Sequence, residues 1–217
     1  MEVFRVPSGY GQSEIVEKKS RFIGHVWKVE NEEQAISHIK DMREQYYDAN
    51  HNVYCYILKE GGIMRYTDDG EPSGTAGMPA LDVFRGQEIY NVCCVVTRYF
   101  GGTLLGTGGL VRAYSKTAKL ALQNAGISEM RMWTTAMIPC SYGQFERIRR
   151  EIEKFSGVTE DTDYGAEIVI TASFPSENVE PFCARLTEIT AGTVTKDSIL
   201  VTEEAFRPME IEMPACD

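Results

Sequence analysis

Hydrophobic and polar positions along the first half of the chain follow patterns typical of an α+β fold. Residues 21–29 alternate as a strand does, and residues 31–46 carry apolar side chains at helical spacing. Asn31, followed three residues later by Gln34, is typical of a helix start. The remaining predicted elements are strands at 15–18, 53–58, 63–66 and 92–96, a turn at 60–62, a short helix at 75–84 and a helix at 110–125.

The pattern changes after Gly126. The predicted elements are a strand at 132–140, a helix at 142–155, a hairpin of 158–162 with 166–174, a helix at 176–189 and a strand at 193–201. This β-α-β-β-α-β order is that of ferredoxin-like domains. We expect the tail from Phe206 to be irregular because it contains Pro208 and Pro214. The sequence therefore predicts two α+β domains, residues 1–130 and 131–217.

Five glycines fall within nine positions, between the apolar strand at 92–96 and the helix at 110–125. They are Gly101, Gly102, Gly106, Gly108 and Gly109. Glycine costs backbone entropy on folding, so this density indicates positive φ angles or a close approach to the backbone. Glycine at a helix start also leaves N–H groups free to face an anion. The run contains no Gly-Lys-Ser/Thr and no G-x-G-x-x-G, so neither common nucleotide loop is predicted.

Cations accompany this glycine run. Arg112, Lys116 and Lys119 have the spacing that places them on one face of the following helix. Arg98 and the two aromatic residues after it form a group that can stack on a base, or that closes the core beneath the loop. A solvated helix face explains the cations equally well. The candidate nucleic-acid or phosphate site comprises Arg98, Gly101, Gly102, Gly106, Gly108, Gly109, Arg112 and Lys116, and the sequence does not place Lys18, Lys19 and Arg21 relative to it.

A second unusual run, residues 68–79, carries three carboxylates within four positions. Asp68, Asp69 and Glu71 are oxygen ligands of the kind that bind Mg²⁺. The same residue types also shape turns and cap helices, and no second group of ligands accompanies them. No spacing indicates a Ser-His-Asp or Cys-His arrangement. We therefore expect no catalytic residue, metal or cofactor, with a magnesium site at these carboxylates as the alternative.

Composition and charge narrow the classes of function. The net charge of the 217 residues is −10; residues 1–130 carry 14 Lys+Arg against 16 Asp+Glu, and residues 131–217 carry 8 against 16. This charge balance permits a basic, phosphate-binding patch on residues 1–130 but not on residues 131–217. The sequence contains no apolar run of membrane-spanning length and no secretory signal, which predicts a cytoplasmic protein without a membrane partner. Scattered cysteines predict reduced, mostly buried thiols and no zinc site: Cys55, Cys93, Cys94, Cys140, Cys183 and Cys216.

Both motifs together resemble the signature of one protein family. Residues 68–77 (DDGEPSGTAG) and 98–110 (RYFGGTLLGTGGL), with KSRF at 19–22 and His51, are similar to the IMPACT family in its bacterial YigZ-like branch. The resemblance implies that the first domain has the left-handed β-α-β fold of a ribosomal protein domain and of elongation factor G domain IV. It implies that the second domain resembles ferredoxin-like domains of elongation factor G.

The resemblance also implies a function in translation. We expect a translation-associated regulatory protein, or one that binds RNA or the ribosome, whose partner is RNA, the translation machinery or a regulatory protein. Fold similarity alone does not establish such a role. The alternative is a magnesium-dependent enzyme acting on a phosphorylated small molecule or nucleotide. A third interpretation is a protein-binding scaffold in which the glycines serve only close packing of helix on sheet.

Overall fold

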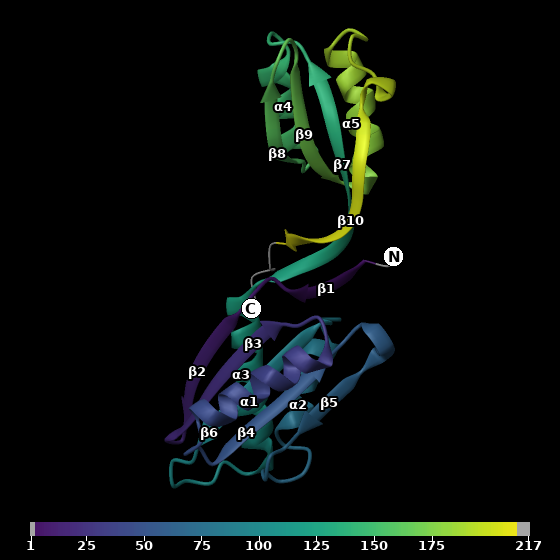
Figure 1. Ribbon diagram of the computed structural model, residues 1–217. Helices are drawn as coiled ribbons and strands as arrows, with labels where there is room; N and C mark the ends of the chain where they lie inside the picture. Colours follow the sequence, from purple (N-terminus) through teal and green to yellow (C-terminus); the bar gives the residue numbers. More distant parts are fainter. Residues whose placement is uncertain (1–2, 212–217) are drawn as a thin grey trace. The chain divides into compact units, whose positions relative to one another are not determined.

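The computed structural model describes residues 3–211 (Figure 1). The described chain divides into two compact units, one of residues 3–129 with 208–211 and one of residues 130–207. Each unit packs helices on an antiparallel sheet. The predicted α+β class with two domains is confirmed.

The first unit is built on a five-stranded sheet in the order β2-β3-β6-β4-β5. Its strands are β2 (Gly11–Glu17), β3 (Ser20–Lys28), β4 (His51–Ile57), β5 (Met64–Thr67) and β6 (Val92–Tyr99). The short β1 (Phe4–Pro7) precedes them in the chain and is not part of this sheet. Strands β3 and β4 are both antiparallel to β6, so they are parallel to each other. Because α1 (Glu32–Gln45) connects them, the β-α-β unit expected for this domain is present.

Helices cover both faces of this sheet (Figure 1). Helices α2 (Gly77–Arg85) and α3 (Thr107–Ala125) share one hydrophobic core with the sheet, and α1 belongs to a second core that includes Val29 and Val95. The predicted start of α1 is confirmed, since Asn31 Oδ1 accepts the Gln34 amide at 2.9 Å. Helix α3 lies very close to β3, because a Cβ added at Gly24 would lie 2.7 Å from a methyl carbon of Thr117.

The second unit has the ferredoxin-like arrangement that the sequence predicts. Its elements are β7 (Ile127–Cys140), α4 (Phe145–Lys154), β8 (Val158–Tyr164), β9 (Ile168–Pro175), α5 (Ser176–Ile189) and β10 (Leu200–Ile211), with a short 3₁₀ turn at Lys196–Ser198 before β10. Strand β9 pairs with β7 and β8, and β10 pairs with β7. The prediction of an irregular tail from Phe206 was wrong over the described residues. Strand β10 runs to Ile211. Among the described strands it pairs with β7 alone, and an edge strand tolerates Pro208, which has no backbone donor.

Five of the six cysteines lie in the described part of the chain, and each is a buried free thiol: Cys55, Cys93, Cys94, Cys140 and Cys183. Cys216 lies outside the described residues. Burial raises the pKa of the Cys93 thiol, which favours the unreactive protonated form. Among residues 3–211, no helix has both the length and the apolar character needed to span a bilayer.

Candidate functional site

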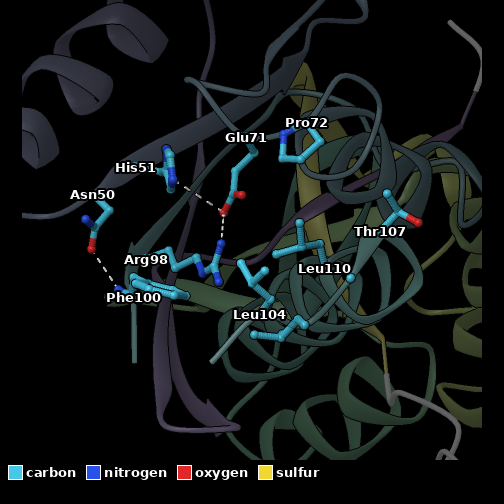
Figure 2. Close-up of a pocket in the computed structure, with 11 residues that line it drawn as sticks. Asn50, His51, Glu71, Pro72, Arg98, Phe100, Leu104, Thr107 and Leu110 are labelled. Carbon is cyan, nitrogen blue, oxygen red and sulfur yellow. Dashed lines mark hydrogen bonds and ion pairs between the residues drawn. The ribbon is translucent and has the colours of Figure 1, made fainter. Parts of the chain in front are cut away.

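The two motifs of the sequence meet at one pocket of the first unit (Figure 2). The loop after β5 carries the acidic motif, and the loop between β6 and α3 carries the glycines. The pocket has a volume of about 450 Å³. It is lined by Asn50, His51, Glu71, Pro72, Arg98, Phe100, Leu104, Leu105, Gly106, Thr107 and Leu110.

A buried ion pair forms the polar floor of this pocket. Arg98 Nη1 lies 2.6 Å from Glu71 Oε1, and the two residues are only 5% and 8% exposed. The Tyr114 hydroxyl donates to the same oxygen at 2.7 Å, and Arg98 Nη2 donates to Ser20 Oγ at 3.3 Å. Burial and the neighbouring Glu71 raise the pKa of Tyr114, so its hydroxyl stays protonated as a donor. These extra hydrogen bonds offset the desolvation cost of burying two charges.

His51 presents its second ring nitrogen to this floor. Its Nδ1 lies 2.8 Å from the carbonyl oxygen of Asp69, and a carbonyl only accepts, so Nδ1 carries the hydrogen. Nε2 then faces Glu71 Oε1 at 3.8 Å, as Figure 2 shows. Within residues 3–211 no hydrogen bond reaches the other oxygen of Glu71, Oε2. The floor therefore offers one carboxylate oxygen, Glu71 Oε2, that has no donor within the described residues.

The three clustered carboxylates make the contacts of turn and capping residues. Asp68 accepts the amides of Gly74, Ala76 and Gly77 at 2.8, 3.1 and 2.8 Å, and so fixes the loop and the start of α2. Asp69 accepts the Asn52 amide and an Arg43 guanidinium, and Glu71 is paired with Arg98. The described residues contain no group of three or more His, Cys, Asp and Glu placed to hold a metal ion. Nothing in this geometry favours the magnesium alternative.

The glycines of the loop have two different structural roles. Gly101 is packed tightly, since a Cβ there would lie 2.0 Å from the backbone carbon of Lys19. Gly102 and Gly106 have φ of 81° and 74°, a conformation that favours glycine. Helix α3 begins at Thr107, three residues earlier than predicted, so Gly108 and its neighbour lie inside its first turn.

The first turn of α3 has no side-chain cap. Its N-cap residue is Gly106, which has no side-chain oxygen to offer, and the first amides of a helix have no acceptor within it. Arg112 is exposed beside this turn, and Lys116 is exposed one turn farther along α3. Together with Gly109, Lys18 and Glu17 they line a hollow of about 230 Å³. The sequence predicted the first three of these residues for the site but did not place Lys18.

Lys18 and Lys19 form the two-residue turn between β2 and β3. Their φ angles are 44° and 67°, so both adopt the left-handed conformation that such turns usually assign to Asn and Gly. Both side chains are exposed. We define the basic surface as Lys18, Lys19, Arg112 and Lys116. Arg98 is not part of it because it lies in the buried ion pair, and Arg21 is paired with Glu14 at 2.7 Å.

Sequence reasoning did not identify the ion pair, the position of His51 in the pocket, or the free carboxylate oxygen of Glu71. Glu71 and Arg98 are 27 residues apart, and no periodicity relates them. His51 appeared only in the family resemblance. Its place directly before a strand was the one local signal that it lies at a sheet end.

Comparisons with known proteins agree with this architecture. Residues 18–122 match the family model described as Impact N-terminal domain, and residues 138–193 match a domain of unknown function, DUF1949. The chain is 35% identical to IMPACT family member YvyE of Bacillus subtilis (strain 168) over 84% of each chain. It is 32% identical to IMPACT family member YigZ of Escherichia coli (strain K12) over 86% of this chain and 92% of the relative. A crystal structure described as that of a hypothetical protein matches with a TM-score of 0.58 and 30% identity, over 94% of this chain and 98% of the other.

Proposed function

The chain belongs to the IMPACT family, and from that premise we propose that it is a translation-associated protein that binds RNA through its first domain. In this proposal residues 1–130 carry the RNA contact, through the first turn of α3 and the basic surface. The acidic residues 131–217 take no part in that contact, because their negative charge repels phosphate.

The observation that carries this proposal is the open first turn of α3 beside exposed cations. The amides of this turn lack a capping side chain, and the positive end of the helix dipole lies there. Arg112 and Lys116 follow on the same helix, and Lys18 lines the same hollow. An RNA phosphate would receive hydrogen bonds from the amides and charge neutralisation from the side chains.

The turn at Lys18 and Lys19 also supports the proposal. Non-glycine residues with positive φ cost folding free energy, and such strain is concentrated at functional sites. Two lysines occupy both positions where Asn and Gly would be more stable. Two lysines at strained backbone positions of an exposed surface are consistent with a negatively charged partner.

Salt dependence of RNA binding tests the proposal. We expect a single-stranded RNA decamer to bind with an affinity that falls steeply with salt, with a log–log slope of about −0.7 for each phosphate contacted. Combining Arg112→Ala with Lys116→Ala should reduce the magnitude of that slope by about 1.4. A matched control combines Lys40→Ala with Arg85→Ala, which removes the same charge from exposed positions on α1 and α2 and should leave the slope unchanged. A flat salt response, or the same loss of affinity in both variants, would contradict the proposal.

A further inference from the structure

We propose that the pocket between the two motifs holds the base of one unpaired nucleotide, whose phosphate lies on the first turn of α3. This inference rests on the proposed function and gives the RNA contact a second component. The basic surface would neutralise the strand, and the pocket would take one base out of the stack. Single-stranded RNA is commonly recognised in this way, by bases splayed out against aromatic side chains or arginine planes.

The walls of the pocket fit a flat apolar ring. Phe100, Leu104 and Pro72 line the pocket, together with the buried Leu110 (Figure 2). Leu104 is 82% exposed and Phe100 is 45% exposed, although both are large apolar side chains. Large apolar side chains that gather exposed at the rim of a cavity indicate a ligand that covers them. The volume of about 450 Å³ is ample for one base.

The floor of the pocket requires a ligand edge that both donates and accepts hydrogen bonds. Glu71 Oε2 is an acceptor without a donor in the described part of the chain, and His51 Nε2 lies beside this carboxylate, 3.8 Å from Oε1. Arg98 Nε–H is a buried donor that finds no acceptor among the same residues, and Arg98 is 95% buried. A purely apolar ligand would leave these groups unpaired and would lose free energy by covering them. The edge of a nucleobase carries donors and acceptors side by side and can pair with both kinds.

The position of α3 connects this pocket to the basic surface. Gly106 and Thr107 line the pocket, and they are also the N-cap and first residue of α3. Leu105 lines both the pocket and the hollow that contains Arg112 and Lys116. A base in the pocket therefore has its own phosphate beside the free amides of the helix. A nucleotide matches the pocket and the helix end together, whereas a nucleoside or a phosphate alone matches only one of them.

Binding of matched ligands tests the inference. The probes are uridine and adenosine 5′-monophosphates, ribose 5-phosphate, a single-stranded uridine decamer and an abasic decamer of the same charge. NMR shifts of the methyl groups of Leu104, Leu105 and Leu110 report on the pocket itself. We expect both nucleotides to shift these methyls and ribose 5-phosphate to leave them unchanged. The uridine decamer should bind about tenfold more tightly than the abasic decamer, the effect typical of stacking one base.

A variant of the rim separates the pocket from the basic surface. Leu104→Ala should weaken the uridine decamer about fivefold and leave the abasic decamer unaffected. Because Leu104 is 82% exposed, this substitution does not disturb the core. Ile36→Ala is the matched control, since Ile36 is an apolar residue on α1 that is 54% exposed and lies outside the pocket.

The outcomes distinguish this inference from the proposed function. If both decamers bind equally and their affinity falls with salt, the base pocket is overturned and the RNA-binding function stands. If the mononucleotides shift the pocket methyls but neither decamer binds, the RNA-binding function is overturned and the pocket stands as a site for free nucleotides. If no ligand binds, both are overturned.

Discussion

Arg98 Nη1 and Glu71 Oε1 form a buried ion pair at 2.6 Å that joins the glycine motif to the acidic motif. Each residue comes from a different motif, and their side chains meet at the floor of one pocket (Figure 2). Tyr114 from α3 donates to the same carboxylate oxygen. The two unusual sequence segments therefore specify a single structural unit.

Removing one partner of this ion pair should destabilise the first domain strongly. In Glu71→Ala the guanidinium of Arg98 stays buried without its counter-ion, which typically costs about 3–5 kcal/mol. Urea unfolding followed by circular dichroism measures this loss. Combining Glu71→Ala with Arg98→Met removes both charges and should recover much of the stability. If the free energy of unfolding of Glu71→Ala lies within about 1 kcal/mol of that of the unmodified protein, the pair does not stabilise the domain as proposed.

Two glycines of the same sequence motif, Gly101 in the loop and Gly108 in α3, should respond to alanine in opposite ways. A Cβ at position 101 would overlap the backbone of Lys19, so Gly101→Ala should cost about 3 kcal/mol or more. At Gly108 the nearest atom is Arg112 Nη1 at 3.5 Å, and the residue lies inside α3. Gly108→Ala should therefore stabilise the fold by about 0.5 kcal/mol. Equal effects in thermal unfolding would show that the loop adapts its backbone.

Replacing the two lysines of the turn should raise the stability of the fold and weaken RNA binding. Lys18→Asn combined with Lys19→Gly places preferred residues at two positions of positive φ, and should raise the free energy of unfolding by about 1 kcal/mol. The same variant removes two charges of the basic surface, so its affinity for RNA at low salt should fall. Melting temperature and RNA titration check the two effects independently. A variant that gains no stability would show that the turn is not strained.

His25 should make stability depend on pH. Burial lowers its pKa to about 4, whereas an unfolded chain has a histidine pKa of about 6.5. Between these values the unfolded state binds more protons, so the stability that His25 contributes is complete above pH 6.5 and is lost as pH falls towards 4. From pH 7.5 to 5 this loss amounts to about 2 kcal/mol. His25→Gln should remove that part of the decline in urea unfolding, and an identical decline in both proteins would rule out His25 as its source.

Local signals were sufficient to predict most elements of the fold. The cap at Asn31, the turn at 60–62 and the element order of the second domain each depend on residues close together in the sequence. The start of α3 was missed because Gly108 and Gly109 have low intrinsic helix propensity, which packing of the rest of α3 overrides. The strand at Pro208 was missed because a one-dimensional pattern does not show that a strand pairs on one side only.

The candidate site was harder to predict because its key contacts are long-range. Arg98 resembled a surface cation in the sequence, since charged residues are rarely buried unless paired. Its partner Glu71 lies in a loop that has no periodic relation to β6. Arg112 and Lys116, in contrast, were placed together correctly because helix geometry alone relates them.

The hydrogen bonds of Asp68 affect how fast a ligand can enter the pocket. Asp68 holds three amides of the loop that leads from Glu71 to α2. The loop beside the pocket is thus preorganised before a ligand arrives, and little ordering entropy remains to be lost on association. Occupation of the pocket should then proceed in one kinetic phase whose rate is set by encounter, with no slower conformational step after it.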